Sequence, residues 1–326
     1  MYIDMHCDTL YEIREERKQG NSCGLLDGKK LHCSVEKLIR GGCSVQNLAV
    51  FIDLKERPDP YENAMELVDI FQEETEKNKD RIRQVRTVRE MEENRKEGIL
   101  SALLTLEEGG MCCGEPEKLN EFYRRGARMM TLTWNYENEL GYPGAESPQR
   151  WSRTEKRTHG LKETGFRFLE EMERLGMIID VSHLSDDGFY DVLDHTTKPF
   201  VASHSNARAL CPHKRNLTDD MLRQLGERGG VAGINFCPEF LDEHPQKENC
   251  LAQIASHALH MIQWGGSDCV GLGSDFDGFS AEGRPEDASH MEDLAWAFHK
   301  AGISDDGIDR ILYENVLRLY RDILKE

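Results

Sequence analysis

The sequence predicts a closed barrel of eight parallel strands alternating with helices, the TIM-type (β/α)8 fold, followed by C-terminal helices. Its 326 residues suit one large α/β barrel. Eight short apolar runs alternate with amphipathic or charged segments, which is the pattern of a parallel sheet covered by helices. Polar side chains recur at the ends of several of these runs, where the mouth of such a barrel would lie.

The apolar runs have the length of strands, and we expect one barrel strand in each. They are Tyr2–Asp8, Val45–Asp53, Ile99–Glu107, Arg128–Trp134, Met177–His183, Pro199–His204, Gly229–Phe236 and Cys269–Phe276. An open, doubly wound sheet is the alternative for the same pattern. No Gly-x-Gly-x-x-Gly follows any of the runs, which argues against a dinucleotide-binding version of that alternative.

Segments with helical spacing lie between the runs. The predicted helices are Pro60–Lys77, Glu115–Arg125, Thr158–Leu175, one capped by Thr218, Leu251–Trp264, and two or three within Glu292–Leu324, the second capped at Ser304. No repeat, low-complexity segment or linker divides the chain. We therefore expect residues 1–326 to form a single domain.

The composition is acidic, with 41 basic and 60 acidic residues and a net charge of −19. This balance argues against nucleic acid or an anionic membrane as a partner. No apolar run approaches the roughly 18–20 residues that a membrane span needs. The ten cysteines show no zinc-finger spacing, and charged residues already occur within the first ten positions. We expect a cytoplasmic protein with reduced thiols.

His6 and Asp8 close the first run. Side chains alternate along a strand, so these two should point to the same side, with Cys7 directed into the barrel wall as a small apolar residue. An imidazole and a carboxylate on one side make half of a site for a divalent metal such as zinc. A histidine that is merely hydrogen-bonded beside a strand-end aspartate is the alternative.

Further acids and imidazoles close other runs: Glu107 and Glu108 the third, His183 the fifth, His204 the sixth, and Asp275 and Asp277 the eighth. All strand ends of one polarity open at the same mouth of a parallel barrel. Burying these groups without partners would be costly, and a cation removes that cost. Three histidines and several carboxylates exceed one tetrahedral site, which suggests two metals bridged by a carboxylate.

The sequence resembles the renal (membrane) dipeptidases, metallopeptidases within the metal-dependent hydrolase barrels of amidohydrolase type. The resemblance covers nearly the whole chain and rests on the motifs Ile3–Asp8, Glu107–Gly110, Leu132-Thr133, Ile179–His183, Ser203–Ser205, Lys214–Asp220 and Gly273–Gly278. It implies a zinc dipeptidase in which a hydroxide bridging two zincs attacks the peptide carbonyl. It also implies tolerance of a D-residue at the C-terminal position and, in many members, a homodimer.

The resemblance implies one zinc bound by His6 and Asp8, a second bound by His183 and His204, and a glutamate between them. That glutamate is Glu107 or Glu108. Counting back from Leu132-Thr133 favours Glu107, whereas anchoring on Gly109-Gly110 favours Glu108. Adjacent strand residues face opposite sides, so only one should be a ligand, and we expect Glu107.

The resemblance also implies groups that act on the substrate. Asp275 would be the acid/base, and Arg215 would hold the C-terminal carboxylate of the dipeptide. From the residues alone, Arg215 beside Lys214 would instead be a solvated surface arginine. The best-known members have a histidine after Leu-Thr that contacts the substrate carbonyl. Here Trp134 and then Asn135 follow, and we expect both at the substrate, with Asn135 replacing that contact.

Two other functions fit the residues less well. One is a related metal-barrel hydrolase that acts on another small amide, such as a cyclic one. The other is a non-catalytic metal-binding scaffold, for which the substitution at Trp134 is the best support. A scaffold has no need of the proton carrier implied at Asp275, so we favour the dipeptidase.

Overall fold

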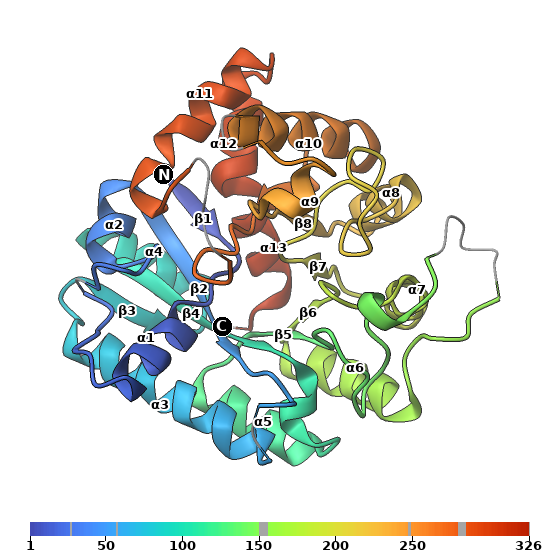
Figure 1. Cartoon of the computed structure of the whole chain (residues 1–326), viewed down its shortest axis with the longest axis horizontal. Helices are drawn as coiled ribbons and strands as arrows, with labels where there is room; N and C mark the ends of the chain where they lie inside the picture. The colour runs from blue at the N-terminus through green and yellow to red at the C-terminus, as the bar shows by residue number, and fades with distance from the viewer. Residues whose placement is uncertain (27, 57, 150–155, 247–248, 280–284, 326) are drawn as a thin grey trace.

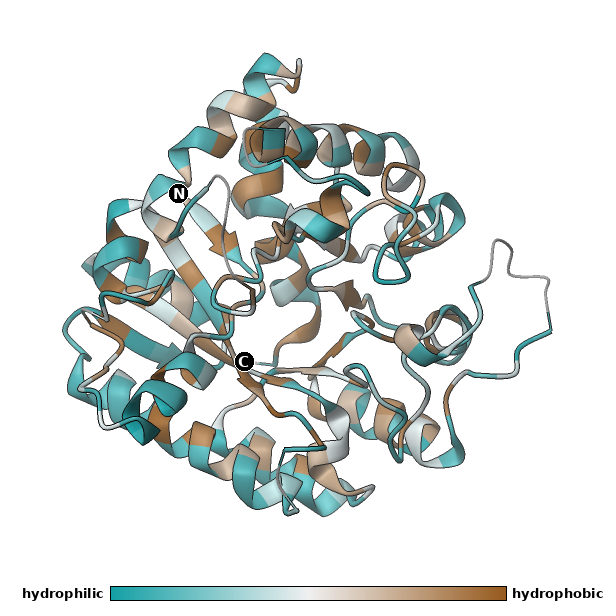
Figure 2. Ribbon diagram, in the orientation of Figure 1, coloured by the Kyte–Doolittle hydropathy of each residue, from teal (hydrophilic) through white to brown (hydrophobic). Residues whose placement is uncertain are grey.

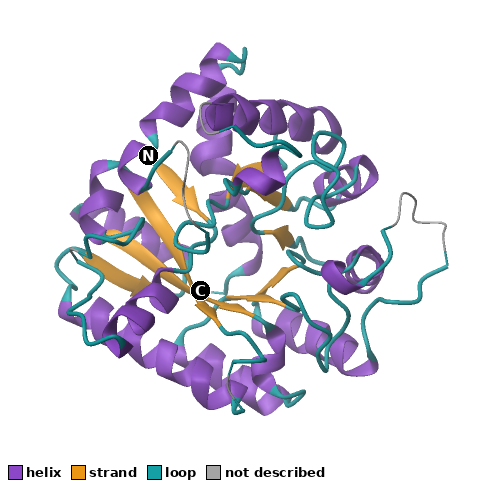
Figure 3. Cartoon of the chain, viewed as in Figure 1, coloured by secondary structure: helices purple, strands orange, loops and turns teal. Residues whose placement is uncertain are grey.

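The computed structural model describes residues 1–26, 28–56, 58–149, 156–246, 249–279 and 285–325. Within these residues, eight parallel strands close into a ring. In order around the ring they are β1 (Tyr2–Asp4), β2 (Cys43–Phe51), β4 (Leu100–Glu107), β5 (Met129–Thr131), β6 (Ile178–Asp180), β7 (Val201–Ala202), β8 (Val231–Ile234) and β9 (Val270–Leu272), which pairs back with β1. Figure 3 shows the strands at the centre and the helices around them. The predicted TIM-type barrel is confirmed, and each predicted run overlaps one strand of the ring.

One further strand, β3 (Ile82–Val85), was not predicted. It pairs with the first half of β4, while β5 pairs with the second half of the same edge. Its two central residues, Arg83 and Gln84, are polar and only partly buried. The apolar signal is therefore confined to the two ends of the strand, which is too little to mark it in the sequence.

The helices cover the outside of the ring (Figure 1). They are α1 (Thr9–Lys18), α2 (Val35–Arg40), α3 (Pro60–Lys77), α4 (Val88–Glu97), α5 (Pro116–Arg125), α6 (Glu163–Leu175), α7 (Asp186–His195), α8 (Asp219–Glu227), α9 (Pro238–Leu241) and α10 (Cys250–Gly265). The predicted bounds hold for α3 and are off by one residue for α5 and α10. Thr218 caps α8, as predicted, by accepting a hydrogen bond from the backbone N–H of Met221. Among these helices, α1, α2, α4, α7 and α9 were not predicted.

The predicted start of α6 at Thr158 was wrong, because the helix begins five residues later at Glu163. Carboxylates on α7 bind the intervening backbone. Asp187 accepts hydrogen bonds from the N–H groups of Thr158 and His159, and Asp191 accepts one from the N–H of Leu161. These contacts hold the segment in a loop. The local sequence pattern could not predict this, because the carboxylates that bind the segment lie on another helix.

The tail forms α11 (Glu292–Lys300), α12 (Asp305–Asp309), a π-helical turn (Arg310–Glu314) and α13 (Asn315–Ile323). Ser304 caps α12, as predicted. The apolar face of α13 packs against the inward side chains at the first half of the strands, including Ile3, Val45 and Leu103. In this position α13 closes one end of the barrel (Figure 1), so the opposite end is the mouth available to a ligand.

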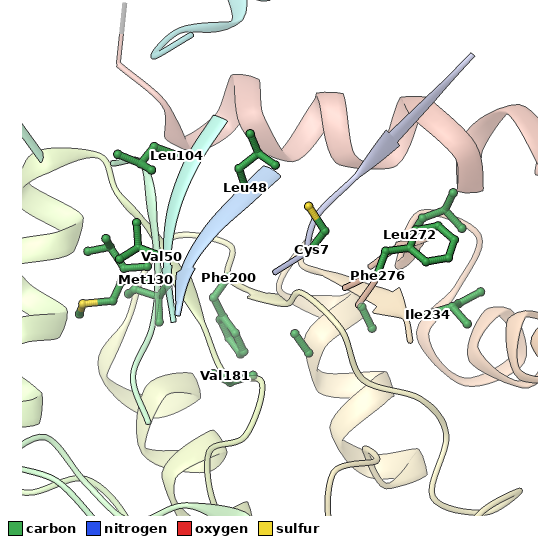
Figure 4. Packing of buried hydrophobic residues seen from close by; sticks show 14 of the residues in the cluster. Cys7, Leu48, Val50, Leu104, Met130, Val181, Phe200, Ile234, Leu272 and Phe276 are labelled. Atoms are coloured by element: carbon green, nitrogen blue, oxygen red, sulfur yellow. The ribbon is translucent and has the colours of Figure 1, made fainter. Parts of the chain in front are cut away.

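Side chains on the outer face of the ring pack beneath the surrounding helices. Figure 4 shows this layer, with Leu104 of β4 and Cys7 among its members, and apolar colouring follows the strands in Figure 2. Leu103 lies in the inner cluster and Leu104 in the outer one, so the two-residue repeat places Glu107 on the inner side, at the mouth. Across the described part of the chain, no helix is both long and apolar enough to cross a bilayer.

Candidate metal and active site

The acids and imidazoles predicted at the strand ends converge at the open mouth of the barrel. His6 and Asp8 follow β1, Glu107 ends β4, His183 follows β6, His204 follows β7, and Asp275 follows β9. The first five are buried, and Asp275 is nearly so. His6 and His204, 198 positions apart in the chain, stack with their ring centroids 3.9 Å apart.

Glu107 occupies the centre of this group, and its two oxygens face different imidazoles. One oxygen, Oε2, lies 3.2 Å from His6 Nε2. The other, Oε1, lies 3.0 Å from His183 Nε2 and 3.5 Å from His204 Nε2. A carboxylate with this arrangement can bind two cations, one on each oxygen.

The neighbouring Glu108 points away from the imidazoles. Its carboxylate accepts hydrogen bonds from the backbone N–H of Gly110 (2.7 Å) and of Trp134 (2.9 Å), and from the side-chain amide of Asn138. Its φ of 95° turns the chain sharply after β4. Glu108 therefore holds together the loops after β4 and β5, and of the two glutamates the structure brings Glu107 to the histidines.

The electrostatics of the two glutamates differ accordingly. Burial alone would raise the pKa of Glu107, but the charge of His6 and hydrogen bonds with the histidines hold this pKa well below its usual range. Burial raises the pKa of Glu108 to about 7. Burial lowers the pKa of His183 to about 3 and depresses that of His204. His183 and His204 are therefore neutral beside an ionised Glu107, which are the forms that bind a metal. Burial would lower the pKa of His6, but the charges of Glu107 and Asp8 raise this pKa well above its usual range, so a cation bound at His6 would displace its proton.

Two sets of ligand atoms could each hold a cation. In the first, His6, Glu107 and His204 each offer one atom, and in the second His6, Asp8 and Asp275 do so, with the atoms of a set within 4.8 Å of one another. His6 Nε2 and Asp8 Oδ1 are buried and have no hydrogen-bond partner in the described part of the protein. Such atoms are costly to bury unless something binds them, and nitrogen and oxygen donors of this kind suit zinc.

Hydrogen bonds from outside the group orient two of the imidazoles. Ser203 Oγ lies 2.6 Å from Asp180 Oδ2 and 2.7 Å from His204 Nδ1. Since the hydroxyl has one proton and Asp180 can only accept, Ser203 accepts from His204 Nδ1–H, which leaves the Nε2 lone pair free. Asn135 Oδ1 lies 3.1 Å from His183 Nδ1 and can accept in the same way.

Asp275 is held in place at the edge of the group. The side-chain amide of Asn235 donates to Asp275 Oδ2 at 2.9 Å, while Oδ1 lies 3.7 Å from His6 Nε2. Burial, and then the charge of Glu107, raises its pKa from the ordinary value of an aspartate. Its φ of 63° is a left-handed conformation that few residue types adopt, as is common at functional sites.

Arg215 is 7% exposed, so the alternative of a solvated surface arginine was wrong. Its Nη2 donates to the backbone carbonyl of His204 at 3.1 Å, and its guanidinium lies 5.6 Å from the centroid of the Phe240 ring. Its Nε is buried without a hydrogen-bond partner among the described residues. The structure thus places the guanidinium of Arg215 next to the backbone of His204, one of the clustered histidines.

The sequence profile of the membrane dipeptidase family, peptidase family M19, matches residues 1–325. The chain belongs to this family. It is therefore a metal-dependent dipeptidase by family, which favours that function over the cyclic-amide hydrolase and the scaffold considered from the sequence.

Solved structures of metallopeptidases agree with this assignment. Dipeptidase AC, a metallopeptidase of family M19, superposes with a TM-score of 0.89 at 27% identity, covering 99% of this chain and 98% of that one. A Rhodobacter sphaeroides metallopeptidase, solved with a phosphinate mimic of the dipeptide L-Ala-D-Ala, also gives 0.89, at 25% identity and 99% coverage of both chains. Among curated sequences, the dipeptidase TcpJ of Claviceps purpurea is 28% identical over 302 residues, or 90% of this chain and 69% of that protein.

The clustered side chains of this M19 dipeptidase open into a cavity of about 410 Å³. Trp134 and Asn135 line it, together with Asp8, Glu107, His183 and Asp275. The indole of Trp134 packs edge-on against Phe51, with centroids 4.9 Å apart. Trp134 and Asn135, which stand where the best-known family members have a substrate-binding histidine, therefore both face the space next to Glu107.

Several residues of this cavity were missed by the sequence analysis. They are Tyr11, Glu12, Phe51, Asp53, Glu56, Cys237, Phe240, Gly278 and Phe279, whereas Asp277, which also lines the cavity, was expected at the end of the eighth run. Phe51 and Asp53 could have been found, because they close the second predicted run just as the metal-binding candidates close theirs. Tyr11 and Glu12 lie in the first turns of α1, for which the apolar pattern offered no sign.

Proposed function

We propose that the protein is a zinc dipeptidase with two ions bridged by Glu107. His6 and Asp8 would hold the first ion, and His183 and His204 the second. The observation that carries this proposal is the position of the two Glu107 oxygens, one beside His6 and the other beside His183 and His204. His6 Nε2 and Asp8 Oδ1 support it, because both are buried without a hydrogen bond among the described residues, while carboxylate oxygens lie 3.2 to 3.7 Å from His6 Nε2.

Bound zinc would supply a nucleophilic water at neutral pH and would polarise the scissile carbonyl. The rest of the reaction falls to side chains of the protein. Asp275, with its raised pKa, would take the proton of the attacking water and deliver it to the leaving amine. Asn235 keeps one oxygen of Asp275 engaged, so the other is left for this transfer.

We propose that Arg215 binds the free carboxylate of the dipeptide, which a buried guanidinium with an unpartnered N–H can do by a charge-assisted hydrogen bond. Asn135 would hold His183 through its carbonyl oxygen and donate its amide N–H to the substrate carbonyl. Trp134 would form an apolar wall beside the scissile bond. These roles divide the work of the family histidine between two neighbouring side chains.

The proposal extends to substrate and setting. The Rhodobacter relative was solved with a mimic of L-Ala-D-Ala, which supports tolerance of a C-terminal D-residue here. All ten cysteines are free, which supports a reducing cytoplasm. We further propose that the chain is one domain, because the family profile spans residues 1–325, and that it forms a homodimer, as the resemblance implies.

The experiment is a turnover assay with chelator-treated protein. We expect no hydrolysis of L-Ala-D-Ala or L-Ala-L-Ala until zinc is restored. The amidated forms of the same dipeptides should not be hydrolysed even with zinc, because Arg215 then lacks a carboxylate to bind. A six-membered cyclic amide serves as the comparison substrate. Hydrolysis of the cyclic amide with no hydrolysis of any dipeptide would contradict the proposal.

A further inference from the structure

One wall of the cavity is acidic and lies across the mouth from Arg215. It consists of Tyr11 and Glu12 on α1, after β1, and of Phe51, Asp53 and Glu56 at and after the end of β2. In the ring, β7 stands three places from β1 and four from β2, which is the far side of an eight-stranded barrel. The chain after β7 carries His204, whose carbonyl binds Arg215.

This placement gives the cavity a direction. A dipeptide with its carboxylate at Arg215 and its scissile bond beside Glu107 has one part left to place, the N-terminal residue. Across the mouth, that residue meets the wall formed by the segments after β1 and β2. The side chains of this wall therefore decide which N-terminal residue fits.

Most carboxylates that line the cavity are already engaged. Glu56 accepts a hydrogen bond from the Tyr11 hydroxyl at 3.0 Å, and Asp53 accepts one from the Lys55 backbone N–H at 2.7 Å. Asp277 accepts from the Thr9 hydroxyl and from the His32 backbone N–H, both at 2.6 Å.

Glu12 differs from these carboxylates. It is partly buried, and the described residues give its carboxylate neither a hydrogen bond nor an ion pair within 4 Å. Burial, followed by the charges of Asp277 and Glu16, raises its pKa, and Lys30 offsets this only in part. A negative charge that is partly desolvated among other acids is stabilised by an added cation.

Aromatic rings beside Glu12 complete the wall. The rings of Tyr11 and Phe51 have their centroids 5.4 Å apart, and Phe51 also packs against the indole of Trp134. Rings of this kind pack well against the methylene stem of a lysine or arginine side chain and leave its charged end free. An apolar surface that leads to an unpaired carboxylate matches a long basic side chain.

We propose that this wall selects dipeptides with lysine or arginine at the N-terminal position, and that Glu12 pairs with the charged end of that side chain. The proposal rests on the dipeptidase function, since it assigns the N-terminal residue of the same substrate. Glu12 is here a specificity residue, because it would contact the N-terminal side chain and not the scissile bond. The alternative partner of the Glu12 carboxylate is the α-ammonium group. Every dipeptide carries that group, so pairing with it would give no preference for a basic side chain.

The test compares kcat/KM for L-Lys-L-Ala and L-norleucyl-L-Ala, which share the α-ammonium and differ in the charged end of the side chain. We expect the zinc-loaded protein to favour the lysyl substrate by about tenfold, the size expected of one partly screened hydrogen-bonded ion pair. Glu12→Gln should lower this ratio about tenfold, mainly through KM. Glu15→Gln is the matched control on the same helix, because Glu15 pairs with Arg14 and Lys18, and it should keep the ratio.

Each outcome decides a different point. A ratio near one for the unmodified protein overturns the proposal without the use of any variant. An equal fall in kcat/KM for both substrates in Glu12→Gln also overturns it, and would show that Glu12 binds the α-ammonium group. If neither substrate is hydrolysed with zinc present, the dipeptidase function itself fails. If the norleucyl substrate is hydrolysed, the dipeptidase function holds, and only the proposed preference for a basic N-terminal residue can have failed.

Discussion

Glu107→Gln is expected to abolish turnover, with a loss of about 10³-fold or more, and to reduce bound zinc to one ion or fewer per chain. The amide keeps the shape of the side chain but offers a single oxygen and no charge, so it cannot serve two cations. Metal analysis of the purified variant, together with dipeptide hydrolysis at saturating zinc, measures both effects. Glu107→Gln protein that retains two zincs and full activity would contradict the bridging role.

Glu108→Gln is the matched control one residue along the chain. Its carboxylate binds the backbone of the following loops and not the histidines, so we expect zinc to be retained. The pKa of about 7 lies above the ordinary 4.5. The folded metal-free protein therefore binds this proton more tightly than the unfolded chain, and its stability falls as the pH rises from 4.5 towards 7. This part of the pH dependence of Tm should disappear in Glu108→Gln. Loss of zinc in this variant, with retention in Glu107→Gln, would reverse the assignment of the two glutamates.

Asp275→Asn is expected to lower kcat by about 10³-fold, as loss of a general acid/base does, while zinc content stays unchanged. Asparagine tolerates the φ of 63° at this position and can keep a hydrogen bond with Asn235, so the fold should be preserved. Dipeptide hydrolysis and metal analysis on the same preparation separate the two effects. Because Asp275 lies 3.7 Å from His6 Nε2, loss of one zinc would show that it is a metal ligand and not the proton carrier.

The barrel could be predicted because its signal is local. Each ring strand is a short apolar run, and a parallel sheet requires such runs to alternate with helices. β3 escaped because Arg83 and Gln84 interrupt its apolar residues. The start of α6 escaped because Asp187 and Asp191, on a different helix, bind the preceding backbone.

The site was predictable to the extent that it follows strand ends. Polar residues that directly follow apolar runs must meet at one mouth, and this rule alone gathers His6, His204 and Asp275. The choice between Glu107 and Glu108 depends on which side of β4 each residue faces, which the structure shows through their contacts. Glu12 could not be predicted, because its exposure to the cavity depends on how α1 packs against β2 and α3.

The most direct test of the two-ion centre is anomalous diffraction from crystals grown with zinc, measured on both sides of the zinc absorption edge. We predict two peaks per chain that flank the Glu107 carboxylate, one beside His6 and Asp8 and the other beside His183 and His204. A single peak, or none within ligand distance of Glu107, would contradict the account.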